Sequence, residues 1–202
     1  MSRLTSLLRT VAAPALSVEA FRTLRLPVEK ASIPAPRSLA VSPAGEVYVL
    51  DKAGRVLVYD RTGRFDRSWW MPDHEIGKPE GVCILEDGRV VVADTHYHRI
   101  VVFDGAGTVL QMFGELGEGP GQFIYPVSVT RDDLGYLYVA EYGGNDRIQK
   151  FTPAGERVLT IGSFGTDAGQ FQRPSGIVWR ADDEAEPPGG GTGTDPSHAN
   201  KA

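Results

Sequence analysis

The chain has 202 residues, enough for one domain of ordinary size or two small ones with a proper core. Its net charge of −5 disfavours a general nucleic-acid binder, and its single cysteine excludes an intrachain disulfide and a multi-cysteine zinc site. No apolar run approaches the roughly 18 residues that span a bilayer. Glycine contributes 24 residues, well above its usual share of about 7%, which favours a turn-rich, mostly β protein.

The first 34 residues are expected to be a leader and an extended lead-in. Arg9 interrupts the apolar part of residues 1–16, whereas an export signal needs a continuous apolar stretch of roughly 7 to 15 residues. Export through a poor signal and an amphipathic or disordered leader of a cytoplasmic protein both stay open, and the second is favoured. Pro34 and Pro36 then indicate extended backbone.

An internal repeat follows. Four prolines, each before a short apolar run, recur at intervals of 43, 47 and 48 residues; they are Pro36, Pro79, Pro126 and Pro174. The repeat predicts a domain over 35–180, with units at about 36–78, 79–125 and 126–173 and the start of a fourth at Pro174. Residues 181–202 lack apolar periodicity and are expected to be a disordered tail rich in glycine, proline and acidic residues.

Each unit contains four short alternating or β-branched runs separated by glycine- and aspartate-rich turns. A unit of this length with four antiparallel strands is typical of one β-propeller blade. Residues 114–126 and 162–174 share the linker pattern G-x-x-G-x-x-x-G-Q-F-x-x-P. Phe123 and Phe171 are expected to plug between adjacent blades, and Pro126 and Pro174 to stop the linker from pairing onward.

The segments 91–104 and 139–151 and the two GQF-x-x-P linkers resemble the NHL-repeat family of β-propellers. The resemblance covers residues 36–179 and implies an all-β ring, six-bladed in most members, with binding on one face or around the central channel. It also implies an interaction platform. Some members bind RNA, and related six-bladed propellers are lyases, hydrolases or lactonases, so the fold alone does not determine the function.

About three blades make an incomplete ring with two open blade faces. Three explanations are compatible with this: a truncated or frame-shifted product of a longer propeller gene, two chains that pair their open faces, or an arc that docks on another protein. All three predict that the open faces are interaction surfaces, although in a truncated product they would have no function.

An acid ends the second strand of each unit and an arginine begins the third; the pairs are Asp51 with Arg55, Asp94 with Arg99, and Glu141 with Arg147. An acid and an arginine across a hairpin can form a bidentate ion pair that also satisfies turn amides. A structural role is favoured, because recurrence in every blade is what a scaffold requires. A ring of charges lining one face is the alternative.

Few residues suggest chemistry. His96 and His98 would point to the same side of an extended strand and could begin a divalent-metal site, with Asp94 or His74 as a third ligand. We favour the interpretation that the two histidines belong to the turn and bind no metal, so we expect no cofactor. The metal-dependent peptide-amidating lyases that resemble this fold draw metal-binding histidines from several blades, and the first and third repeats offer none at the equivalent hairpin. Cys83 lies in an apolar run and is expected to be a core residue.

The binding candidates are Arg61, Arg64, Trp69, Trp70, His96 and Tyr97. Trp69 and Trp70 begin an irregular loop that replaces the GQF linker; it could contact a ligand, but a hydrophobic plug is favoured. The arginines 61, 64 and 67, interleaved with Phe65 and Trp69, suit a base-stacking platform, although one cluster in an acidic chain argues weakly for nucleic acid.

The sequence therefore predicts a propeller scaffold that binds a protein partner, a ligand or a second copy of itself, without a catalytic constellation. The alternatives are a metal-dependent lyase or hydrolase and an RNA-binding module.

Overall fold

The computed structural model of the chain describes residues 23, 24, 26, 27 and 35–180. They form three four-stranded antiparallel sheets, here called blades 1, 2 and 3, and one short 3-10 helix. The predicted tail at 181–202 and most of the predicted leader lie outside the described residues. The described part of the chain holds no helix long and apolar enough to cross a membrane.

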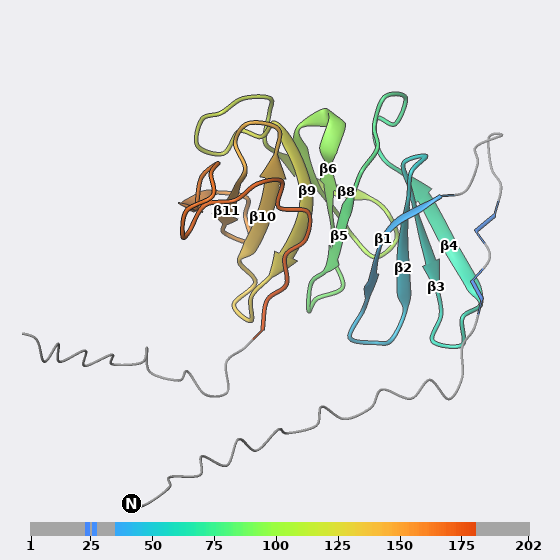
Figure 1. Cartoon of the computed structure of the whole chain (residues 1–202). Coiled ribbons are helices and arrows are strands. Elements are labelled where there is room, and N and C mark those ends of the chain that lie inside the picture. The colour runs from blue at the N-terminus through green and yellow to red at the C-terminus, as the bar shows by residue number, and fades with distance from the viewer. Residues whose placement is uncertain (1–22, 25, 28–34, 181–202) are drawn as a thin grey trace, which may run out of the picture.

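Every blade is an antiparallel meander whose strands follow in sequence order, which confirms the predicted propeller architecture (Figure 1). Blade 1 consists of β1 (Pro36–Val41), β2 (Val47–Asp51), β3 (Arg55–Tyr59) and β4 (Phe65–Trp70). Blade 2 consists of β5 (Gly81–Ile84), β6 (Val90–Asp94), β7 (Arg99–Phe103) and β8 (Val109–Phe113), with the helix η1 (Thr95–Tyr97) after β6. Blade 3 consists of β9 (Tyr125–Arg131), β10 (Leu137–Tyr142), β11 (Arg147–Phe151) and β12 (Arg157–Ile161).

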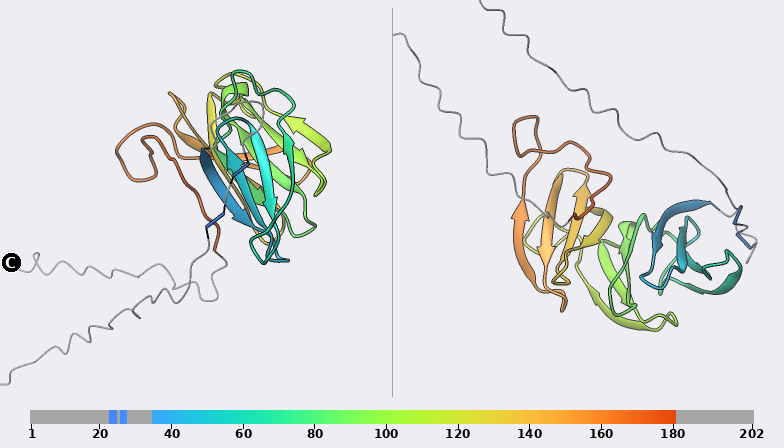
Figure 2. Two further views of the ribbon diagram at one scale, coloured as in Figure 1. Left: turned by 90° about the vertical axis from the view of Figure 1, so that its right-hand side faces the viewer. Right: turned by 90° about the horizontal axis from the view of Figure 1, so that it is seen from below.

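The three blades lie side by side in a fan, with the first strands β1, β5 and β9 next to one another (Figure 2). Successive side chains of a strand point to opposite faces, so each blade has a front face toward the following blade and a back face toward the preceding one. The front of blade 1 packs on the back of blade 2, mainly through Tyr48, Leu50, Val56, Val58, Val90, Val92, Val101 and Phe103. The front of blade 2 packs on the back of blade 3 through Val91, Ala93, Ile100, Val102, Leu137, Val139 and Phe151.

Flanking segments lie on the two outer faces of the fan. Leu24 and Leu26 pack on the back of blade 1, which is built from Val47, Val49, Leu57 and Tyr59. The front of blade 3 is contacted by the segment after β12, where Trp179 stacks on Tyr138 at a ring distance of 5.7 Å. Both outer faces are therefore covered in part by this chain itself.

Residues 174–179 differ from the predicted opening strand of a fourth blade, because the structure assigns no strand to them. The Ile177 N–H donates to the Ser128 Oγ at 3.2 Å, a contact with a side chain rather than with the backbone of β9. A strand requires a ladder of backbone hydrogen bonds, and no such ladder is formed here within the described residues.

Candidate binding site

All three predicted acid–arginine pairs are formed at the same end of their blades. Arg55 Nη2 lies 2.6 Å from Asp51 Oδ2, and both side chains are buried. Arg99 Nε lies 2.9 Å from Asp94 Oδ2, and Arg147 Nε lies 2.7 Å from Glu141 Oε1. In each pair the acid is completely buried, so the arginine compensates a charge that would be costly alone.

Each arginine also reaches back to the segment that precedes its own blade. Arg55 donates from Nη1 to the Pro27 carbonyl at 2.7 Å, and Arg99 donates from Nη2 to Asp73 at 2.9 Å. Arg147 donates to the carbonyls of Glu118, Gly119 and Gln122 at 2.9 to 3.0 Å. Arg99 and Arg147 therefore hold the connections between blades as well as their own hairpins, and Arg55 holds the segment before blade 1.

Asp94 differs from its two counterparts. Asp51 Oδ1 accepts from the Ala53 N–H at 2.6 Å, and Glu141 Oε2 accepts from the Ile124 N–H at 2.8 Å. Among the described residues, Asp94 Oδ1 has no hydrogen-bond donor. The irregular loop before blade 2 lacks the linker amide that serves Glu141, and burial raises the pKa of Asp94 to about 6, although Arg99 opposes the shift.

Aromatic rings gather beside these ion pairs. The ring of Tyr125 lies 5.7 Å from His96, 5.8 Å from His98 and 5.6 Å from Tyr142. The Arg173 guanidinium lies over Tyr142 at 4.7 Å. We call these five residues the histidine–tyrosine cluster. The cluster joins η1 and its C-cap residue His98 in blade 2 to β9, β10 and the last linker.

The backbone supports this cluster closely. A Cβ atom on Gly143 would lie 2.6 Å from the Tyr125 ring, and its φ of 99° suits glycine. His98 Nδ1 contacts the Ile124 carbonyl, and the Arg173 N–H donates to Asp146. The rings of His96, His98, Tyr125 and Tyr142 are half-buried, so they are held in place and still reach the surface.

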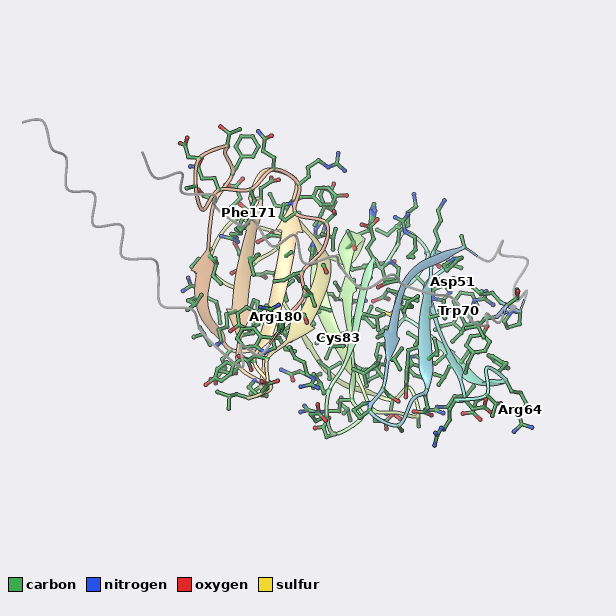
Figure 3. The ribbon with its side chains drawn as sticks, turned by 60° about the horizontal axis from the view of Figure 1, so that its bottom comes forward. Asp51, Arg64, Trp70, Cys83, Phe171 and Arg180 are labelled. Atoms are coloured by element: carbon green, nitrogen blue, oxygen red, sulfur yellow. The ribbon has the colours of Figure 1, made fainter. Side chains whose placement is uncertain are left out.

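The structure brings some of the predicted binding residues together and separates others. Trp70, His96 and Tyr97 lie at the end of the fan that carries the ion pairs; Trp70 contacts His74 at 4.7 Å and Tyr97 lies 4.9 Å from the Arg99 guanidinium. Arg61 and Arg64 belong to the turn at the opposite end of blade 1, where Figure 3 shows Arg64 far from Asp51 and Trp70. The predicted stacking platform is therefore not assembled.

Trp69 and Phe65 also lie apart. Trp69 packs into the interface between blades 1 and 2, 5.8 Å from Phe103, whereas Phe65 pairs with Tyr59 on the back of blade 1. Arg67 pairs with Glu46 and Asp66. Met71 is buried beside Trp69, so these two side chains fill the interface where a GQF linker is absent.

The linker phenylalanines have different surroundings. Phe123 is fully buried between blades 2 and 3, with its ring 5.5 Å from Phe151. Phe171 is half-buried, because no described blade follows blade 3. The prediction that Pro126 stops the linker from pairing is wrong, because Pro126 lies in β9 and the pairing with β10 continues to Tyr125. Pro174 lies outside the described strands.

The two candidate metal ligands do not lie on an extended strand. His96 belongs to η1, and His98 has a left-handed φ of 56°. Both rings nevertheless face Tyr125. Within residues 35–180 and the four described residues before them, no group of three or more histidine, cysteine, aspartate or glutamate side chains could hold a metal ion.

Cys83 lies on β5, half-buried beside the core between blades 2 and 3. Burial raises the pKa of its thiol to about 12. It lines a groove of about 490 Å³ formed by the inner strands β1, β5 and β9 and residues 177–179.

The sequence did not single out Tyr125, Tyr142 or Arg173. Tyr125 and Arg173 occupy the same position of the GQF-x-x-P pattern, directly before the proline, and Tyr142 directly follows the acid of its blade. These repeat positions could have indicated the cluster from the sequence, because each places a variable side chain at the end of the fan that carries the ion pairs.

Comparison with known proteins agrees with this geometry. Residues 77–103 match the family model described as NHL repeat. The chain is 34% identical over 103 residues to Protein brain tumor of Drosophila melanogaster, a match that covers 50% of this chain and 9% of that protein. It is 33% identical over 100 residues to E3 ubiquitin-protein ligase NHLRC1 of Homo sapiens, covering 49% of this chain and 24% of that protein. The chain thus spans at most about a quarter of these relatives.

Solved structures share the fold. Streptogramin B lyase has a TM-score of 0.51 and 18% identity, covering 61% of this chain and 39% of that chain. Virginiamycin B lyase from Staphylococcus aureus has a TM-score of 0.51 and 20% identity, covering 61% and 40%. Residues 77–103 thus match an NHL repeat, and the three blades give this chain the β-propeller fold that these solved structures share.

Proposed function

We propose that this chain is a protein-binding scaffold and that its contact surface is the histidine–tyrosine cluster. The observation that carries the proposal is the convergence of four half-buried rings and one guanidinium, from two blades and a linker, around Tyr125. Tyrosine and arginine are enriched among the residues that dominate protein interfaces.

The cluster also has the rigidity that a contact surface needs. Gly143 lies directly against Tyr125, His98 Nδ1 contacts the Ile124 carbonyl, and the backbone N–H of Arg173 donates to Asp146. Little side-chain freedom would therefore be lost when a partner covers these rings, which lowers the entropic cost of binding.

The names of the relatives support a role in protein binding. One relative is named an E3 ubiquitin-protein ligase, and another, 42% identical over 50 residues, is RING finger protein nhl-1 of Caenorhabditis elegans. A propeller that binds a protein could hold the protein on which a ubiquitin-protein ligase acts. The match covers a minor part of each relative, so this support is general.

The test is selection of linear peptides from a display library on the immobilised chain, followed by affinity measurement. Tyr142→Ala should weaken the selected peptides about tenfold or more, since truncating a central interface tyrosine typically costs at least about 1.4 kcal/mol. The matched control is Arg64→Ala at the opposite end of blade 1, where the side chain is 85% exposed; it should leave affinity unchanged.

Peptides that bind both variants equally would show that the cluster is not the contact surface. Salt-dependent binding of single-stranded RNA that Tyr142→Ala abolishes, without peptide binding, would instead favour the RNA-binding module.

A lyase or hydrolase is the alternative of another class. Its support is the fold shared with the two solved lyases, and a fold does not determine chemistry. Such an enzyme would need ligating or acid–base side chains from several blades to converge, which a structure of the chain with a bound divalent metal would reveal.

A further inference from the structure

The chain contains the same linker twice. The first linker, residues 114–126, connects blades 2 and 3, and the second linker, residues 162–174, follows blade 3. Corresponding residues are separated by 48 positions, and six are identical: three glycines, the glutamine (Gln122 and Gln170), the phenylalanine (Phe123 and Phe171) and the proline (Pro126 and Pro174).

Their folded conformations are also the same. Gly117 N donates to the Phe123 carbonyl at 3.2 Å, and Gly165 N donates to the Phe171 carbonyl at 3.1 Å. The phenylalanine N–H donates at 2.8 Å in both linkers, to Glu115 and to Ser163.

The glutamine completes each loop in the same way. Gln122 Oε1 accepts from the Gly119 N–H at 2.9 Å, and Gln170 Oε1 accepts from the Asp167 N–H at 3.0 Å. A Cβ atom on Gly117 or Gly165 would lie only 2.2 or 1.9 Å from that oxygen, so any other residue there would displace the glutamine from this position. The conformation is therefore determined within the linker itself.

The first linker holds an arginine of the blade that follows it. Arg147 donates from Nη1 to the Glu118 carbonyl at 2.9 Å and from Nη2 to the Gly119 and Gln122 carbonyls at 3.0 Å. Three carbonyl oxygens thus surround one guanidinium. A planar fork with five donors matches such a set, whereas an ammonium group on a flexible stem does not.

The second linker presents the same carbonyls, at Thr166, Asp167 and Gln170, without a guanidinium on them in the part of the chain that the structure describes. Thr166 and Asp167 are exposed. We propose that the second linker is a preformed receptor for the guanidinium of an arginine, which a polypeptide segment outside the described residues supplies.

The contacts of the blade arginines indicate where this guanidinium comes from. Arg55 is engaged by Asp51 and the Pro27 carbonyl, Arg99 by Asp94 and Asp73, and Arg147 by Glu141 and the first linker. A second copy could therefore offer none of these three arginines without breaking a contact that it already makes. The receptor is suited to a different arginine-bearing strand.

The experiment is a titration of the ¹⁵N-labelled full chain with L-arginine amide, followed through amide chemical shifts, with L-lysine amide as the matched probe. Arginine amide should saturably shift the amides of residues 165–171 and leave those of 117–123 unchanged, because Arg147 occupies the first linker. Lysine amide should bind about tenfold more weakly or not at all.

Two variants keep the outcome decisive. Arg147→Lys vacates the first linker, so the amides of 117–123 should then respond as those of 165–171 do. Gln170→Ala removes the acceptor that orders the second linker and should abolish its response while the blades stay folded.

Equal shifts with both amides, or no saturable shift at 165–171, would overturn the proposal. Shifts of these amides that instead grow with protein concentration and disappear in Arg55→Lys would overturn the assigned source and identify a second copy.

Discussion

Phe123→Ala should destabilise the chain far more than Phe171→Ala, although the two phenylalanines occupy the same place in two linkers of the same pattern. Phe123 is fully buried, and its ring packs 5.5 Å from Phe151 of the following blade. Truncation of such a side chain costs about 3 to 5 kcal/mol. Phe171 is half-buried and has no described blade after it, so the same truncation should cost about 1 kcal/mol or less.

The measurement is urea unfolding of both variants and the parent, followed by circular dichroism. With a denaturant slope of about 2 kcal/mol per molar, the midpoint should fall by about 2 M for Phe123→Ala and by about 0.5 M for Phe171→Ala. The two linkers share their internal hydrogen bonds, so the difference isolates packing between blades. Equal shifts would refute the reasoning and assign both phenylalanines to the stability of their own loops.

Two further predictions concern titratable groups. Burial raises the pKa of Asp94 to about 6, above its value of about 3.9 in an unfolded chain, so the folded state binds more protons between about pH 4 and pH 6 and stability falls as the pH rises through that window. Asp94→Asn should remove about 2 kcal/mol of this dependence in urea midpoints at pH 4.5 and 7.5; an unchanged slope would contradict it. Cys83, whose thiol pKa is raised to about 12, should react with a disulfide reagent at pH 8 about 100-fold more slowly in the folded chain than in urea, and equal rates would contradict the raised pKa.

The repeat made the blades predictable, since the spacing of Pro36, Pro79 and Pro126 and the alternation of each strand depend on local sequence alone. The strand alternation also explains why the predicted stacking platform does not form. Neighbouring residues such as Trp69 and Trp70 point to opposite faces, so residues that are close in sequence, including Arg64 and Trp69, were not brought to one surface.

The cluster could not be predicted, because it depends on packing between blades. His96 and Tyr125 meet only when blade 3 docks on blade 2, and Arg173 reaches Tyr142 from the linker beyond β12. Local patterns carry no information on such distant pairs. The chain also presents residues 174–179 without the ladder that their apolar pattern suggested, since strand formation needs a neighbour as well as a suitable sequence.

Arg55, Arg99 and Arg147 each contact a segment that precedes their own blade, so each contact joins a later part of the chain to an earlier one. The first linker is synthesised before Arg147, so its three carbonyls cannot accept hydrogen bonds from this arginine until β11 has been made. Each blade arginine thus completes a contact with a segment that is made before it. A ribosome that pauses after β10 would leave blades 1 and 2 built but the joint at residues 114–126 unsecured.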